Sequence, residues 1–265
     1  MRLHVTHTTR YRYREPMRYA VQSLCLTPQT GSAQIVEYWS LGAPARLFEL
    51  KDGFGNVCHS YSFIGSVLTS FVNAAGVIQT LGVAEFADAP ALPHPLFYLR
   101  STPLAEPHAR LAAFARPLVG ASVSLQTLLA LSRAVAGQVR YRSGSTDVKT
   151  TALEAFDLGS GVCQDQAHVM VAACRSLGIP ARYVSGYFYA ANEPELASHA
   201  WTDVCLDVAA RRWVSIDVTH GCTIDERHVR LATGTDYNAC PPIKGIRHGG
   251  RGETMTVNIA IKPAD

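Results

Sequence analysis

Apolar and polar residues alternate along the first part of the chain. Leu3, Val5 and Tyr11 fall on one face, and arginines gather on the other. A period of two is typical of a half-buried β-strand. The same alternation predicts further strands in the ranges 35–41, 46–50, 57–63, 68–73 and 77–81. Gly and Asn within residues 52–56 can adopt the positive φ that a hairpin turn needs, and the small residues 74–76 separate the last two predicted strands.

Prolines crowd residues 90–107, where neither a sheet nor a helix could continue. We therefore predict an N-terminal antiparallel β-domain over residues 1–90 and a second domain over 91–265. Beyond the prolines the apolar period becomes helical, with Ser124 placed to cap the first helix and Gly178 to end the third. Helices are expected at 125–139, 151–156 and 163–177, and strands at 182–189, 200–206, 213–218 and 255–261. The last strand can return to a sheet, and the fold class is α+β.

The composition indicates a chain with a large buried core. Apolar residues make up 48% of the 265 residues and charged residues only 17%, which excludes a disordered chain. The formal charge of +3 is too small to indicate a nucleic-acid partner. We find neither the apolar stretch of a secretion signal nor the roughly 18 apolar residues of a membrane span. The seven cysteines contain no C-x-x-C pair, so we expect reduced thiols, a cytoplasmic location and no membrane partner. The sequence leaves the oligomeric state open.

Two glycines precede the third predicted helix. Gly159 and Gly161 allow a tight turn, and the helix begins at or beside Cys163. The first amide groups of a helix have no partner within it and carry partial positive charge. They stabilise a thiolate at Cys163 and can also donate to an oxyanion. A free cysteine taken alone is more often a small core residue, so this turn does not by itself establish a nucleophile.

A second candidate group pairs a histidine with a carboxylate. Residues 201–206 and 212–217 predict a hairpin that turns near Val208, in a register that places His199 directly opposite Asp217. Directly opposed side chains have Cβ atoms about 4.5–5.5 Å apart, so the carboxylate can accept a hydrogen bond from the imidazole. That bond would hold the ring and stabilise the imidazolium that forms on taking a thiol proton. A one-residue slip would instead place the two side chains on opposite faces.

Four short motifs follow one another along the second half of the chain. They are GVCQDQAH (161–168), GIPARYVSGY (178–187), SHAW (198–201) and DVTHG (217–221). Together they resemble the motifs of the bacterial transglutaminase-like proteins, which are often described as cysteine proteases. The stretches HTTRYRY (7–13) and DGFGN (52–56) resemble the N-terminal β-region that accompanies this family. The resemblance extends over nearly the whole chain, as far as GTDY (234–237).

This resemblance implies a papain-like, transglutaminase-type domain after the N-terminal β-domain. Cys163 would be the nucleophile, His199 the general base and acid, and Asp217 the orienting carboxylate. Gln166 stands where an aromatic residue is expected in many relatives, which affects the packing behind the nucleophile. Animal transglutaminases of the wider superfamily need calcium, but this chain has no acidic loop with the density of calcium ligands. We therefore expect neither a metal nor another cofactor.

Other residues near the motifs have less definite roles. The second oxyanion donor is the side chain of Gln164, a backbone amide or the hydroxyl of Tyr141, and the sequence does not choose among them. Asp165 is expected to complement the helix dipole rather than to take part in catalysis. Trp201 shares a strand face with His199, where it either shields the Cys–His pair from water or packs in the core. Four further residues are candidate zinc ligands, but their spacings match no zinc finger or ribbon: His168, His220, Cys222 and Cys240.

Cysteine-dependent hydrolysis of an amide or peptide is the function that the sequence favours. Attack by Cys163 on the carbonyl carbon would give a thioester acyl-enzyme, which water resolves. Two alternatives stay open: transfer of the acyl group to an amine, as in a transglutaminase, and a binding module that keeps the fold without activity. Binding alone would not require a complete Cys–His–Asp set. The expected partner is a peptide or another amide-bearing substrate, which the sequence does not identify.

Overall fold

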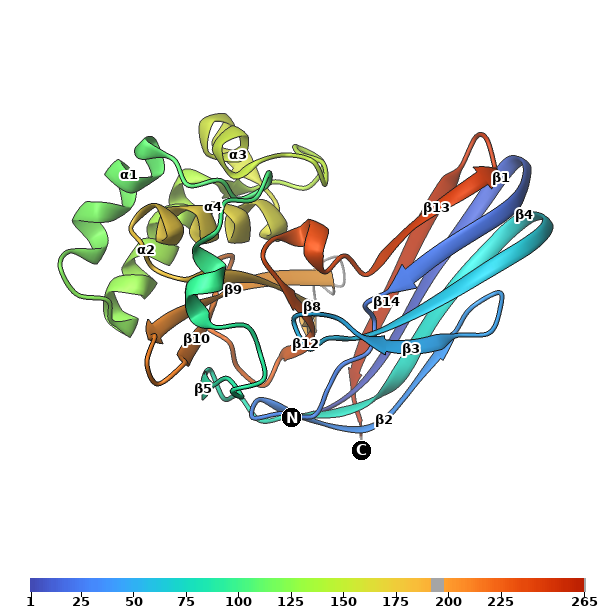
Figure 1. Cartoon of the computed structure of the whole chain (residues 1–265), viewed down its shortest axis with the longest axis horizontal. Helices are drawn as coiled ribbons and strands as arrows, with labels where there is room; N and C mark the ends of the chain where they lie inside the picture. Colours follow the sequence, from blue (N-terminus) through green and yellow to red (C-terminus); the bar gives the residue numbers. More distant parts are fainter. Residues whose placement is uncertain (192–197, 265) are drawn as a thin grey trace.

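The computed structural model describes residues 1–191 and 198–264. A long antiparallel sheet lies on one side, and a body of helices and a second sheet lies on the other (Figure 1). The strand order of the long sheet is β13-β1-β4-β2, with β14 also paired to β1 and β3 to β4. Its strands are β1 (Arg2–Leu24), β2 (Gln34–Gly42), β3 (Phe48–Lys51), β4 (Val57–Thr80), β13 (Ile243–Gly249) and β14 (Thr254–Pro263). The terminal strand predicted at 255–261 is thus confirmed, and it returns to the sheet that contains the N-terminal strands.

The second sheet has the order β11-β10-β9-β8-β12, with β5 paired to β10. Its strands are β5 (Glu85–Ala87), β8 (Ala181–Phe188), β9 (Ser198–Asp207), β10 (Arg212–Asp217), β11 (Cys222–Thr223) and β12 (His228–Gly234). The helices are η1 (Pro95–Leu99), α1 (Ala109–Val119), α2 (Leu125–Gln138), α3 (Ala152–Leu158), α4 (Cys163–Ser176) and η3 (Tyr237–Ala239). A short parallel pair, β6 (Arg140–Tyr141) and β7 (Ser160–Gly161), precedes α4. The predicted α+β class is confirmed.

Local hydrogen bonds explain where the helices begin. The Ser124 hydroxyl accepts the Thr127 backbone N–H at 3.2 Å at the start of α2. The carboxylate of Glu154 accepts the Thr151 backbone N–H at 2.8 Å in a capping box at the start of α3. Gly178 follows α4 with a φ of +76°, a conformation that glycine adopts without steric cost. These features agree with the helix boundaries predicted from the sequence.

The predicted break at residues 74–76 is wrong, because β4 runs through it without interruption. Small residues are needed there for close packing rather than for a turn. A Cβ atom on Gly76 would collide with the carbonyl oxygen of Tyr38 and with the ring and Cα of Trp39, both on the neighbouring strand β2. The sequence signal for a turn therefore marks a place where two strands approach each other closely.

The long sheet and the body share one hydrophobic core. Leu3 and Val5 of β1 belong to the same buried cluster as Tyr183 and Tyr187 of β8. His7 crosses this boundary with a hydrogen bond of 2.8 Å between its Nδ1 and the Tyr187 hydroxyl. Burial lowers the pKa of His7 to about 4, so the ring is neutral near pH 7. The long sheet thus supports the strand that lies next to β9 in the second sheet.

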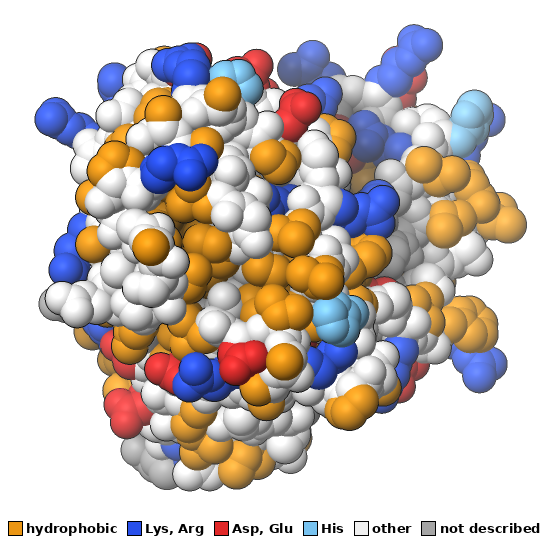
Figure 2. Space-filling model, turned by 60° about the vertical axis from the view of Figure 1, so that its left-hand side comes forward, with side chains coloured by type: hydrophobic (Ala, Val, Ile, Leu, Met, Phe, Trp, Pro, Cys, Tyr) orange, Lys and Arg blue, Asp and Glu red, His pale blue; other side chains and the backbone are white. Residues whose placement is uncertain are grey.

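The surface reflects the low proportion of charged residues. Figure 2 shows hydrophobic side chains spread across the middle of the face on which α1 and α2 lie, with Lys and Arg scattered among them. Within residues 1–191 and 198–264, no helix is long and apolar enough to cross a membrane.

Substituting alanine for Gly76 is expected to destabilise the fold. The added methyl group would force β2 away from β4, and overpacking of this kind costs about 1–3 kcal/mol in the free energy of unfolding. Gly31→Ala is the matched control, because nothing lies within 4 Å of the added Cβ. Urea unfolding of the two variants checks this, and equal stabilities would contradict the packing argument.

Candidate active site

The start of α4 presents Cys163 on the turn that follows β7. Gly161 pairs in parallel with Tyr141, and a Cβ atom on Gly161 would lie 2.7 Å from Cβ of Asp165. Asp165 turns back to accept the Val162 backbone N–H at 2.8 Å and the Thr146 hydroxyl at 2.6 Å. Burial raises the pKa of Asp165, while these hydrogen bonds oppose that shift. Asp165 therefore caps the helix start, which agrees with its predicted structural role, and it fixes the turn that carries Cys163.

His199 and Asp217 meet as predicted from their strand positions. The distance from His199 Nε2 to Asp217 Oδ2 is 2.9 Å, and both side chains are completely buried. His199 lies near the start of β9, and Asp217 is the last residue of β10. The carboxylate can thus hold the imidazole in one orientation.

The predicted hairpin register is wrong by two residues. Ile216 pairs with Thr202 and Val214 with Val204, so the position that faces Asp217 in this register is 201 rather than 199. The turn is longer than expected, with a bulge after Arg212 and a φ of +52° at the residue before it. A shift of two residues keeps each side chain on its original face, and for that reason the His199–Asp217 contact survives.

The remaining nitrogen of His199 is available to Cys163. Nδ1 is buried and has no partner of full hydrogen-bond geometry among the described residues. Burial alone lowers the pKa of His199, but the Asp217 carboxylate and then the Cys163 sulfur raise it to about 10. Burial likewise raises the pKa of Asp217, but the histidines around it, His199 first, hold that pKa well below its usual range. This arrangement stabilises an imidazolium between a sulfur and a carboxylate.

Two further histidines bind the same carboxylate. His220 Nδ1 lies 2.6 Å and His228 Nε2 lies 2.9 Å from Asp217 Oδ2. Sequence reasoning considered His220 only as a metal ligand and missed His228 altogether. The three-residue spacing from Asp217 to His220 is that of a tight turn and was an available signal, whereas His228 arrives from β12 at the far side of the sheet order.

Among the described residues, three of these side chains also form a group with the composition of a metal site. One ligand atom each from His199, Asp217 and His228 lies within 4.8 Å of the others. Each of these atoms is already engaged in a hydrogen bond of 2.9 Å. These hydrogen bonds account for the close approach of the three side chains without a bound ion.

The residues predicted with less definite roles lie around this centre. The Gln164 amide approaches the Val148 carbonyl only at 3.5 Å, and Tyr141 lies in β6 beside the turn before Cys163. Trp201 is completely buried, with its ring centroid 6.3 Å from that of His199.

Gln166 lies directly behind the start of α4. Its amide donates to the Val139 carbonyl at 2.8 Å, and its side-chain oxygen accepts the Thr219 hydroxyl at 2.7 Å. A polar residue here therefore ties α4 to the end of α2 and to the segment after β10. Gln166 thus contributes two hydrogen bonds to the packing near the start of α4.

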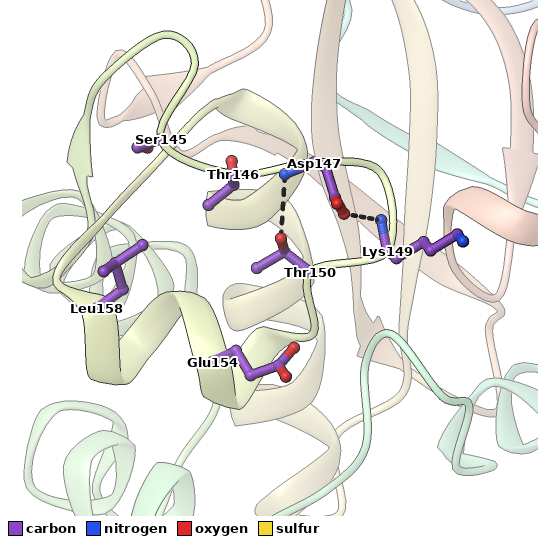
Figure 3. A pocket seen from close by; sticks show the side chains of 7 residues that line it. All are labelled: Ser145, Thr146, Asp147, Lys149, Thr150, Glu154 and Leu158. Carbon is purple, nitrogen blue, oxygen red and sulfur yellow. Dashed lines mark hydrogen bonds between the residues drawn. The ribbon is translucent and has the colours of Figure 1, made fainter.

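A surface hollow of about 430 Å³ lies between α3 and the loop that precedes it (Figure 3). Its lining consists of Ser145, Thr146, Asp147, Lys149, Thr150, Glu154 and Leu158. The loop is held by hydrogen bonds from the Asp147 backbone N–H to the Thr150 hydroxyl and from the Lys149 backbone N–H to the Asp147 carboxylate. None of the predicted catalytic residues lines this hollow, although Thr146 contacts Asp165 at the start of α4.

Two family models match this chain. The model of the transglutaminase-like superfamily matches residues 112–218, and that of the bacterial transglutaminase-like N-terminal region matches residues 3–79. The resemblance found in the sequence motifs is thereby confirmed. Cys163, His199 and Asp217 all lie within the first matched range.

Relatives of similar length match nearly the whole chain. An uncharacterized protein of Mycobacterium leprae is 27% identical over 270 residues, which cover 96% of this chain and 95% of that protein. An uncharacterized protein of Mycobacterium tuberculosis is 28% identical over 291 residues, which cover 99% and 93%. The crystal structure of a putative cysteine protease from Cytophaga hutchinsonii aligns with a TM-score of 0.76 and 21% identity over 100% of this chain and 92% of that one. The chain therefore has a transglutaminase-like fold.

Cys163 is expected to react with iodoacetamide near pH 6 far faster than an ordinary thiol, whose pKa is about 8.5. His199→Ala should lower this rate roughly 100-fold, because the imidazolium that stabilises the thiolate is lost. Cys222 is the control within the same chain, since burial and nearby carboxylates raise its pKa to about 11. Peptide mass spectrometry of the alkylated cysteines measures both rates, and equal labelling of Cys163 and Cys222 at pH 6 would contradict the assignment.

Proposed function

We propose that this chain, which joins a core of the transglutaminase-like superfamily to a bacterial transglutaminase-like N-terminal region, is a cysteine-dependent hydrolase of amide or peptide bonds. One observation carries the proposal. Cys163 begins α4 beside His199, whose other ring nitrogen is bonded to the buried Asp217. The nucleophile, the base and the orienting carboxylate thus lie next to one another in that order in space, which is the arrangement that acyl transfer through sulfur requires.

Acylation proceeds by attack of the Cys163 sulfur on the carbonyl carbon of the substrate. Nδ1 of His199 takes the thiol proton, a carbon–sulfur bond forms, and the carbonyl electron pair moves to oxygen. When this tetrahedral intermediate collapses, the carbon–nitrogen bond breaks and His199 gives its proton to the departing nitrogen. Asp217 stays ionised throughout and stabilises the imidazolium without accepting the proton.

The start of α4 supplies positive charge to the developing oxyanion. The amide of Cys163 is among the first N–H groups of the helix, which have no partner within it. We assign it as one oxyanion donor. The second is the side chain of Gln164, whose contact with the Val148 carbonyl is long at 3.5 Å, or the hydroxyl of Tyr141.

Deacylation decides between hydrolysis and transfer. In hydrolysis His199 takes a proton from water, the hydroxide attacks the thioester carbon, and the carbon–sulfur bond breaks as the proton returns to Cys163. An amine in place of water would form a new amide instead. Hydrolysis needs only water at the acyl-enzyme, whereas transfer also needs a site that positions the amine. We therefore propose hydrolysis of a peptide-type amide as the reaction.

Incubation with a peptide library in water enriched in ¹⁸O tests this directly. Wild-type protein is expected to release peptides that carry one ¹⁸O in the new carboxylate, and Cys163→Ala should release none. Cys174→Ala is the matched control, because it makes the same change in a buried part of α4. Incorporation of a fluorescent primary amine into glutamine peptides without cleavage would indicate transfer rather than hydrolysis. If the wild type shows neither reaction, the chain is a binding module without activity.

The second oxyanion donor can be identified by comparing Gln164→Ala with Tyr141→Phe. Removal of the true donor should lower kcat about 100-fold or more with little change in KM, because the interaction exists only in the transition state. The other variant should behave like the wild type. Steady-state kinetics on one cleaved peptide measure the effect, and wild-type kcat in both variants would assign the second donor to the backbone.

A further inference from the structure

We propose that His228 and His220 are positioning residues, which hold the Asp217 carboxylate and through it fix His199 against Cys163. This inference rests on the function proposed above and adds two residues to its machinery. Asp217 Oδ2 faces three imidazole nitrogens: Nε2 of His199, Nε2 of His228 and Nδ1 of His220, at 2.9, 2.9 and 2.6 Å. The other oxygen, Oδ1, accepts the His220 backbone N–H at 3.2 Å.

The surroundings of His228 determine which of its nitrogens carries the proton. The backbone N–H of Asp225 donates to His228 Nδ1 at 3.0 Å. A neutral imidazole has one N–H group, so Nδ1 as an acceptor leaves the hydrogen on Nε2, where it points at Asp217. A protonated His228 would carry hydrogens on both nitrogens, and the Asp225 carboxylate lies 3.1 Å from Nδ1. In both protonation states, therefore, His228 donates to Asp217.

His220, in the turn after β10, contacts the same carboxylate. Its ring stacks on Phe188 with centroids 4.4 Å apart and an angle of 27°, which holds the plane of the imidazole. Its side chain is 27% exposed, whereas those of His199, His228 and Asp217 are fully buried. His220 therefore lies between the carboxylate and solvent, and it donates to Oδ2 from Nδ1.

Three donors on one buried oxygen leave the carboxylate little freedom to rotate. Without the two side-chain donors, the carboxylate would keep only His199 and the His220 backbone N–H, and it could leave the imidazole in more than one orientation. With His228 and His220 in place, the ring of His199 has one position, and its Nδ1 is held toward the sulfur. Positioning matters strongly in catalysis, since a displacement of about 1 Å can cost about 100-fold in rate.

Every titratable group that faces Asp217 bears on the pH dependence of the site. Among the described residues these groups are His199, His220, His228, Cys222 and Arg227, and Asp225 lies against His228. Arg227 carries a permanent positive charge and lies over the ring of Phe188, 4.9 Å from its centroid. Asp225 is paired with Arg227 at 2.6 Å and with His228. A substitution of either proposed histidine changes the donors to Asp217 while leaving this ion pair in place.

The test compares variants that remove a donor with variants that keep one. His228→Leu removes the donor, whereas His228→Gln keeps an amide N–H for Asp217 and an oxygen for the Asp225 amide. His220→Phe keeps the stacking on Phe188 but removes Nδ1, and its partly exposed position makes a folded variant obtainable even if His228→Leu fails to fold. His7→Gln is the control, a buried histidine at the junction with the long sheet and outside the proposed machinery.

The rate of Cys163 alkylation is measured for each variant from pH 5 to pH 9, and kcat and KM are measured on a peptide that the wild type cleaves. We expect His228→Leu and His220→Phe to lower the alkylation rate at pH 6 and kcat by about tenfold to 100-fold, with KM nearly unchanged. His228→Gln should recover most of the loss, and His7→Gln should match the wild type.

The outcomes separate this inference from the proposed function. If folded His228→Leu and His220→Phe keep the wild-type alkylation profile and kcat, the inference is wrong while the proposed function stands. If the wild-type Cys163 itself reacts no faster at pH 6 than an ordinary thiol, the proposed function fails. An equal loss in His228→Leu and His228→Gln would also overturn the inference, because a donor at that position would then not be what matters.

Discussion

The negative charge of Asp217 is buried with no exposure to solvent, and the geometry of the site depends on how that charge is compensated. A buried carboxylate is tolerated only when hydrogen-bond donors or cations surround it. Here the donors are imidazoles from three separate segments: β9, the turn after β10 and the start of β12. They can meet only when the second sheet is fully assembled. The same contacts that make the carboxylate tolerable therefore also orient His199, so the fold and the site are stabilised by one set of interactions.

The same sheet contains a second buried carboxylate that is compensated differently. Asp203, on the neighbouring strand β9, is bound by Arg182 at 3.0 Å, by Arg230 at 2.7 Å and by the Ser215 hydroxyl at 2.7 Å. Burial raises the pKa of Asp203, but the two guanidinium groups lower it to about 2. Arginine keeps its proton at any physiological pH, so this cluster cannot exchange protons and serves to hold the strands together. Asp217 is surrounded instead by imidazoles, and one of them, that of His199, also faces the Cys163 sulfur. Two similar buried acids on adjacent strands thus differ in chemistry because their partners differ.

Most of the elements follow from local sequence, and the exceptions have physical causes. Helix starts at Ser124 and Thr151 were predictable because their caps act within one turn. Helix α1 was missed because it contains Pro117, which ordinarily interrupts a helix. The false break near Gly76 arose because a small residue indicates either a turn or a close approach, and only the neighbouring strand decides which. His228 could not be placed, since no local pattern reveals that β12 lies beside β8.

The pairing of His199 with Asp217 was predicted in a register that the structure does not have, and the reason it survived is general. Side chains alternate between the two faces of a strand, so an error of two residues preserves the face and an error of one does not. A long imidazole can still reach a carboxylate two positions along the neighbouring strand. Sequence therefore specifies which side chains share a face more reliably than which are directly opposed. An active site that needs only a shared face and a flexible reach is correspondingly tolerant of changes in turn length, provided that the number of inserted residues keeps each side chain on its face.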